Sequence, residues 1–390
     1  MNFWKNTKAV LIRERDEMFN RPLYTFWPIV VLLFSLIFFT SFMHEGLPSK
    51  LPIGVVDYDE TPFTRNIIRQ LNAEEGVGII KHYSNNSEAR QALQLGKIYG
   101  YILMPHDFYS DVLGNKRPDI TYYVNDAYLV GGNLANKAFL EMSNLISGAY
   151  QRSVLETKGV PKDQIMGLIK PIVIDSHLIG NTKVHYGIYL VNTLIPGIFE
   201  LMCMFLTIFA IGYELKMKTS REWLKTANGS MAAAMTGKMI PYTLMFLILG
   251  VAYDLILYKL IGYPNNGNIG NMILDISLLV LASEAIGIFI IGMFPILRQS
   301  IFTAAFYGLL GFSLSGFTYP VEYMHPGVQG LSQIYPIRHY FMFYCKEVIF
   351  DTGFAGWWIQ VAALLAFLIL PFFIYHRLER ALINQNFPTL

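Results

Sequence analysis

The sequence predicts a membrane all-α bundle of six transmembrane helices with an inserted α/β extracytoplasmic domain. Residues 24–43 carry no charged side chain, residues 44–186 are of mixed polarity, and further apolar runs appear only after that segment. Of the 390 residues, 53% are hydrophobic and 15% are charged, and the mean hydropathy is +0.38. Such a composition is typical of polytopic membrane proteins, and a helix needs about 20 apolar residues to cross a bilayer.

The chain is expected to start with an interfacial helix and an uncleaved membrane anchor. The run at 23–43 is longer than the apolar core of a signal peptide, and no small-residue cleavage site follows it. Residues 1–22 are expected to form a cytoplasmic amphipathic helix on the membrane surface; packing on a partner protein is the alternative. The apolar side chains that alternate there with Lys and Arg are Phe3, Trp4, Val10, Leu11, Met18 and Phe19.

The positive-inside rule assigns the orientation of the spans. Lys and Arg gather before the first span, between the second and third, and after the last, whereas the loop 262–271 has neither. Both termini, including a tail at 377–390, are therefore expected in the cytoplasm, and residues 44–186 outside it. The six spans are expected at about 23–43, 187–212, 239–261, 272–294, 300–319 and 355–375, so that five of them lie within 187–376.

Residues 44–186 are expected to fold as a small mixed or parallel sheet with helices. Short apolar runs predict the strands, and helical spacing of apolar residues predicts the helices, with Ser87 as an N-cap. The strands are expected at 51–57, 77–82, 99–104 and 120–124, and the helices at 62–72, 87–95 and 131–157.

No motif in the sequence argues for catalysis or for a metal site. Asp57, Asp59 and Glu60 lie close together, but the stretch lacks the Gly and the terminal Glu of a calcium loop. Cys203 and Cys345 have no metal-ligand spacing. There is no nucleophile elbow, no pair of catalytic carboxylates and no basic stripe for nucleic acid. We therefore expect a protein that is not an enzyme, with no catalytic residue, metal or cofactor on this chain and no nucleic-acid partner.

The loop between the second and third spans, 213–238, contains a charged segment that is predicted to be helical. The helix is expected over 220–226, with Ser220 as its N-cap. A short rigid helix held between two spans can transmit a push from a cytoplasmic partner. The alternative is an ordinary basic loop that only sets the topology.

Matches in order along nearly the whole chain resemble the permeases of ABC type-2 exporters, in the multidrug-efflux-like subgroup with a large domain after the first span. In the loop after the second span, the similar residues are Arg221-Glu222-Trp223-Leu224, Thr226 and Gly237-Lys238; the family commonly has Gly-Thr where Trp223 stands. The other matches are Glu14, Asp16, Arg21-Pro22, Leu51 to Asp59 with Arg65, Leu194 to Gly197, Pro241-Tyr242, Leu314 to Phe317, Tyr319-Pro320, Met324, Pro326, Tyr335-Pro336 and His339-Tyr340.

The resemblance implies a transmembrane subunit whose coupling helix docks in an ATPase partner. ATP and Mg would bind that partner, because no G-x-x-x-x-G-K-[ST] loop occurs in this sequence. The residues implied in ATPase coupling are Ser220, Arg221, Glu222, Trp223, Leu224 and Thr226. A segment at 320–350 is too polar to cross the bilayer and is expected to be re-entrant, and the residues implied in an outer gate there are Tyr319, Pro320, Met324, Pro336 and His339.

Polar and small residues inside the spans are expected to have specific roles. Glu200 and Glu284 lie near the middle of the second and fourth spans, where a carboxylate is costly. Each is expected on the translocation path or in an interhelical hydrogen bond. Asp254 is expected to pair with Lys259. Small residues in the fifth span allow close approach of a helix from a second copy or from the same chain: Gly308, Gly311, Ser315 and Gly316.

The favoured function is that of an exporter permease in the bacterial inner membrane, moving a hydrophobic or amphipathic compound outward. Its expected partners are an ATP-binding subunit, a second permease in a dimer, membrane lipid and a periplasmic adaptor protein. The alternative function is a membrane-anchored receptor or scaffold whose external domain binds an envelope partner.

Overall fold

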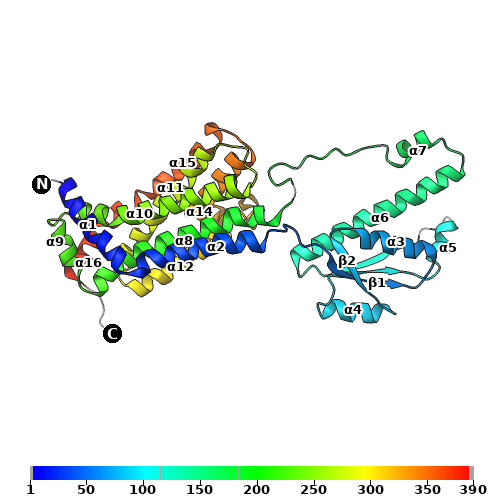
Figure 1. Cartoon of the computed structure of the whole chain (residues 1–390), viewed down its shortest axis with the longest axis horizontal. Helices are drawn as coiled ribbons and strands as arrows, with labels where there is room; N and C mark the ends of the chain where they lie inside the picture. Colours follow the sequence, from blue (N-terminus) through cyan, green and yellow to red (C-terminus); the bar gives the residue numbers. More distant parts are fainter. Residues whose placement is uncertain (1–2, 115, 117, 183, 386–390) are drawn as a thin grey trace. The chain divides into compact units, whose positions relative to one another are not determined.

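The computed structural model of the protein describes residues 3–114, 116, 118–182 and 184–385. The predicted chain ends at 1–2 and 386–390 therefore lie outside the described residues. The chain forms two compact units, Met1–Gly46 with His177–Leu390, and Leu47–Ser176. The first consists of helices and the second contains the sheet (Figure 1).

Apolar segments form the long helices of the first unit. Five helical segments of the described chain are long and apolar enough to cross a membrane: α2 (Pro22–Phe42), α8 (Tyr186–Lys216), α10 with its π-helical extension η1 (Met231–Ile261), α11 (Ile269–Met293) and α15 with α16 (Phe354–Asn384). The fifth predicted span, 300–319, corresponds to α12 (Leu297–Leu314), which has the polar Arg298 and Gln299 in its first turn. It is shorter and is not among the five.

Two span boundaries differ from the prediction for local reasons, and one predicted span is divided into two helices. Helix α10 begins at Met231, because the side chain of Ser230 caps it by accepting from the N–H of Ala233. Residues 231–238 of the predicted loop 213–238 are therefore helix. Helix α12 ends at Leu314, two residues before Gly316, which has a φ of +95°. The last span breaks between α15 (Phe354–Phe367) and α16 (Leu370–Asn384).

Short elements lie at both ends of the first unit. One end has α1 (Phe3–Asn20) and α9 (Ser220–Thr226). Helix α9 has its predicted bounds, but its N-cap is Thr219 rather than Ser220. In the segment predicted to be re-entrant, the chain forms η2 (Val321–Tyr323), α13 (Pro326–Ser332), α14 (Pro336–Tyr344) and η3 (Cys345–Ile349).

Helices α8 and α11 are the most buried of the candidate spans, with 61% and 72% of their apolar windows inside the protein. Small residues let neighbouring helices approach them. A Cβ added at Gly308 of α12 would lie 2.4 Å from the side chain of Leu201 in α8. A Cβ at Gly311 would lie 2.9 Å from Tyr335. These two glycines of the fifth span therefore accommodate residues of the same chain.

The second unit contains a four-stranded sheet in the order β2-β1-β3-β4. Strand β1 (Leu51–Asp57) is parallel to β2 (Val77–His82) and to β3 (Gly100–Met104), and β4 (Thr121–Val124) is antiparallel to β3. The first two strands have their predicted bounds. The helices are α3 (Pro62–Ala73), α4 (Asn86–Gln94), α5 (Phe108–Leu113), α6 (Leu129–Thr157) and α7 (Lys162–Ile169).

Alternation along β1 supplies a core on each face of the sheet. Ile53 and Val55 pack in one cluster with residues of α3 and α6. Val56 points to the opposite cluster, with Ala89 and Ala92 of α4. The N-cap of α4 is Asn85, whose side chain accepts from the N–H of Glu88. The prediction of Ser87 as this cap was wrong, because an Asn two residues earlier reaches the free N–H.

Candidate functional site

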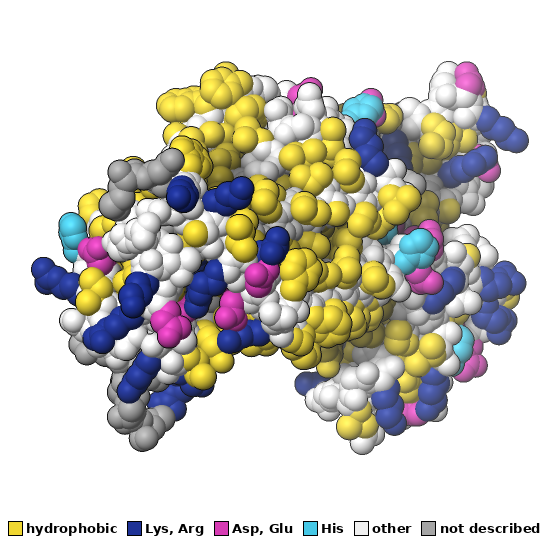
Figure 2. Space-filling model, turned by 60° about the vertical axis from the view of Figure 1, so that its left-hand side comes forward, with side chains coloured by type: hydrophobic (Ala, Val, Ile, Leu, Met, Phe, Trp, Pro, Cys, Tyr) yellow, Lys and Arg dark blue, Asp and Glu magenta, His cyan; other side chains and the backbone are white. Residues whose placement is uncertain are grey.

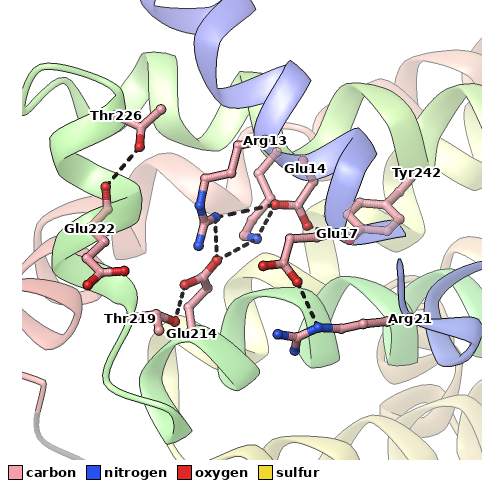
Figure 3. Close-up of polar contacts among 10 residues, drawn as sticks. Arg13, Glu14, Glu17, Arg21, Glu214, Thr219, Glu222, Thr226 and Tyr242 are labelled. Carbon is pink, nitrogen blue, oxygen red and sulfur yellow. Dashed lines mark hydrogen bonds and ion pairs between the residues drawn. The ribbon is translucent and has the colours of Figure 1, made fainter. Parts of the chain in front are cut away.

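A cluster of charged residues joins α1 to the ends of α8 and α10. We call Arg13, Glu14, Glu214 and Lys238 the ion cluster; Arg13 is half-buried and the other three are buried. Lys238 Nζ donates to Glu14 Oε2 at 2.6 Å and to Glu214 Oε1 at 3.2 Å. Arg13 Nη1 donates to Glu214 Oε1 at 2.6 Å. The side chains of α1 point into the space between the other two helices (Figure 3).

Two hydroxyls complete the hydrogen bonding of the ion cluster. Tyr242 donates to Glu14, and Thr219 donates to Glu214. Glu14 and Lys238 are each 1% exposed, and Glu214 is 5% exposed. Two cations and two carboxylates balance, so the cluster contains buried charge but no uncompensated charge. Such a set is strongly destabilised when one member is removed.

Burial by itself would lower the pKa of Arg13. The hydrogen bond that Arg13 donates to Glu214 and the charges of Glu214, Glu14 and Glu17 outweigh this effect and raise the pKa of Arg13 above its ordinary value. Arg13 is therefore a cation in the cluster at neutral pH.

Local sequence explains how α1 reaches this position. Asn6, Val10 and Glu14 repeat every four residues and form one buried stripe of the helix. A Cβ at Gly237 would lie 2.6 Å from the backbone oxygen of Thr7, so a glycine is needed where α1 crosses α10. The predicted amphipathic helix thus packs a stripe of polar and apolar side chains against other helices of the same chain, while Trp4 stays 73% exposed.

Helix α9 is fixed to the rest of the unit by its inner face. Ser220 donates its hydroxyl to the carbonyl of Leu382 in α16 at 2.7 Å. Trp223 is fully buried, and its ring lies 4.8 Å from the ammonium of Lys238. The side chains of Ser220, Trp223 and Leu224 are all buried in this chain, and their role in ATPase coupling stays a prediction.

The outer face of α9 carries the charges that remain exposed. Arg221 and Glu222 are exposed, as is Lys225, while Thr226 is half-buried and donates to the carbonyl of Glu222 at 3.0 Å. Glu222 lies apart from the ion cluster in Figure 3. Lys and Arg side chains gather at this end of the unit, next to a broad apolar surface (Figure 2).

The two carboxylates predicted inside the spans are both buried, in different surroundings. Glu284 accepts from the hydroxyl of Thr243 in α10 at 2.7 Å, an interhelical hydrogen bond. Glu200 in α8 is 1% exposed, and its Oε1 has no hydrogen-bond partner among the described residues. Neither residue belongs to the ion cluster.

The residues predicted for an outer gate do not form one cluster in the structure. His339 in α14 is 6% exposed, and its ring nitrogens lie within hydrogen-bond distance of Gln360 and the carbonyl of Gln333. Pro336 is buried at the start of the same helix. Tyr319 and Pro320 are exposed, and Met324 is half-buried.

Sequence reasoning missed Glu347, a fully buried carboxylate near the same end. It accepts from the N–H of Asn268, from Asn271 Nδ2 and from Trp357 Nε1, at 2.7–2.8 Å. It thereby connects the loop before α11 to α15. Its position next to Lys346 and Val348 gives no periodic signal that would single it out.

The pair predicted between Asp254 and Lys259 is absent from the described contacts. Both carboxylate oxygens of Asp254 are buried without a hydrogen-bond partner among the described residues, and Lys259 is exposed. Asp254 and Lys259 are five residues apart, whereas side chains that meet on one face of an α-helix are three or four apart, and here one residue is buried and the other exposed. No group of three or more His, Cys, Asp or Glu in the described chain could hold a metal ion.

Two comparisons with known proteins agree. The family model described as ABC-2 family transporter protein matches residues 23–375. The linearmycin resistance permease protein LnrN of Bacillus subtilis (strain 168) is 21% identical over 351 residues, which is 85% of this chain and 88% of the relative. The matched region includes α8, α9 and α10, and therefore three of the elements that meet at the ion cluster.

Proposed function

The chain belongs to the ABC-2 transporter family, and we propose that it is the permease of an exporter that moves a hydrophobic or amphipathic compound out of the cytoplasm or the inner leaflet. A separate ATPase subunit binds ATP and Mg and supplies the energy. The similarity to a permease named for linearmycin resistance supports an export role.

The observation that carries the proposal is the connection of α9 to the membrane helices. Glu222 is exposed on the outer face of α9, and the exposed Arg221 donates from Nε to the carbonyl of Ile383 in α16 at 2.7 Å. Trp223 of the same short helix lies on Lys238 of the ion cluster. Lys238 belongs to α10, and Glu214 to α8. A displacement of α9 is therefore passed to two spans and to α1 together, since packed helices move as units.

The charge distribution supports the orientation of the subunit. With α1, α9 and the end of α16 in the cytoplasm, the basic surface at this end meets the positive-inside rule. The unit 47–176 then lies outside the cytoplasm of a bacterial inner membrane, where it is available to a periplasmic adaptor. A second permease, identical or similar, completes the transporter as a dimer in the lipid.

Co-purification tests this function. The full chain, tagged at the C-terminus and isolated from its native membrane in mild detergent, is expected to bring with it a protein that contains a G-x-x-x-x-G-K-[ST] loop, in comparable amount. Recovery of the intact chain without such a protein, but with an envelope protein bound through 47–176, would favour the receptor instead.

A further inference from the structure

A cavity of about 440 Å³ lies between α10, α11 and the break that separates α15 from α16. Its walls are mostly apolar and include Met239, Leu244 and Ile288, with Leu368 and Pro371 at the helix break. A carboxylate, that of Glu284, lines the same cavity. The cavity belongs to the helical unit and shares none of its lining residues with the ion cluster.

Glu284 is only partly satisfied by the protein. The residue is 5% exposed, and Oε2 accepts from the hydroxyl of Thr243. The second oxygen, Oε1, is buried and has no hydrogen-bond partner among the described residues. Thr243 lines the cavity as well. A polar atom without a partner in a membrane interior is costly, and a charged one more so.

The surroundings of Glu284 contain no cation that could pair with it. None of the residues that line the cavity is Lys, Arg or His. The ion pairs found elsewhere in the described chain use other carboxylates. Oε1 of Glu284 is therefore free to pair with a cation from outside the described chain.

We infer that this cavity is a binding site for an amphipathic cation, whose apolar body occupies the space between α10, α11 and α15–α16 and whose positive group pairs with Glu284. Apolar walls with one convergent charged group are the usual composition of a small-molecule site. The negative charge of the carboxylate selects cations over anions of the same shape, because it attracts a cation and repels an anion strongly in a medium of low dielectric constant.

The position of Glu284 along its helix indicates how the ligand enters. It lies about 14 Å of helix before Met293, the end of α11, because each residue adds about 1.5 Å. The hydrocarbon core is about 30 Å thick, so the site is near the middle of the membrane. An amphipathic cation that has partitioned into the inner leaflet can reach it sideways. This route of entry rests on the proposed function, whereas the binding of the cation does not.

Two hydrophobic ions of equal shape and opposite charge test the site. The full chain in nanodiscs is titrated with tetraphenylphosphonium and with tetraphenylborate, and binding to protein-free nanodiscs is subtracted. We expect saturable binding of tetraphenylphosphonium that is weakened at least tenfold by Glu284→Gln. Tetraphenylborate binding should not fall in this variant. Glu200→Gln, which removes an equally buried carboxyl that does not line the cavity, should change neither ion.

A second variant keeps the test decisive if Glu284→Gln folds poorly. Leu244→Trp fills the cavity, leaves the carboxylate in place and should weaken tetraphenylphosphonium binding. The inference is overturned if the wild-type chain shows no saturable tetraphenylphosphonium binding. It is also overturned if Glu284→Gln affects both ions equally or neither, as expected for a carboxyl that is simply protonated. Because the assay needs neither ATP nor an ATPase, failure of the proposed function would leave its result unchanged.

Discussion

The ammonium of Lys238 donates a hydrogen bond of 2.6 Å to the carboxylate of Glu14, across 224 positions of the chain. Both residues are 1% exposed. One belongs to the helix before the first span and the other to the start of the third predicted span. This contact therefore fixes α1 to α10 at the place where α9 is also attached, through the ring of Trp223.

Loss of Lys238 should destabilise the helical unit strongly. In Lys238→Met, Glu14 keeps only Tyr242 and the more distant Arg13, whose Nη1 lies 3.8 Å from Oε2. Breaking a buried pair by removing one partner costs about 3–5 kcal/mol, and thermal unfolding of the full chain in detergent measures the effect.

A double variant separates the contribution of the Glu14–Lys238 ion pair to stability from the effect of changing the side-chain volume. Glu14→Gln combined with Lys238→Met should be less destabilised than the sum of the two single variants. The exposed pair Arg152–Glu156 serves as the control, because Arg152→Met should cost less than about 1 kcal/mol. Equal effects of Lys238→Met and Arg152→Met would show that the ion cluster does not stabilise the fold.

Gly237 should tolerate no side chain, because α1 crosses α10 there. A Cβ at this position would lie 2.6 Å from the Thr7 oxygen and 2.7 Å from the Val10 Cβ. We expect Gly237→Ala to cost about 1–3 kcal/mol, the usual range for overpacking. Gly167→Ala in α7 is the matched control, because nothing lies within 4 Å of its Cβ. A neutral Gly237→Ala would mean that α1 does not pack closely on α10.

Residues 47–176 should fold without the membrane helices. They form a compact unit with their own sheet and a core on each face of β1. Expressed alone, they are expected to give a soluble α/β protein with one cooperative unfolding transition by circular dichroism. Ile53→Ala should lower its stability by about 2–5 kcal/mol. A fragment without cooperative unfolding would contradict the division into two units.

Glu347 should be essential for the stable conformation of the loop before α11. Glu347→Ala leaves the N–H of Asn268, the amide of Asn271 and the indole N–H of Trp357 without their acceptor. Each unsatisfied buried donor costs about 1–3 kcal/mol, so the variant should unfold at a markedly lower temperature. Limited proteolysis near 262–268 should become faster; an unchanged cleavage rate would show that the loop is held by other contacts.

The sequence predicted best those elements whose signals are local. The strands 51–57 and 77–82 and helix α9 at 220–226 have the bounds that their apolar runs and charge pattern indicated. Errors of one or two residues occur at the caps, where neighbouring residues compete: Asn85 caps α4 in place of Ser87.

The ion cluster could not be predicted from the sequence, because its members come from three helices that are distant in the chain. Glu14, Glu214 and Lys238 have no common spacing, and only the packing of α1 on α10 brings them together. The inward position of Trp223 depends on the same packing. Its bulky ring, in place of the small residue common in the family, was the one visible sign that this helix is anchored from within.

Photo-cross-linking from position 222 tests the central claim, that α9 receives the energising subunit. A benzophenone amino acid replaces Glu222 in the full chain, and a second variant carries it at the exposed Met166 of α7 as the control. We predict that irradiation of native membranes links position 222, but not position 166, to a protein with a G-x-x-x-x-G-K-[ST] loop, identified by mass spectrometry. The absence of such a product at position 222, in a chain that is otherwise folded and inserted, would contradict the account.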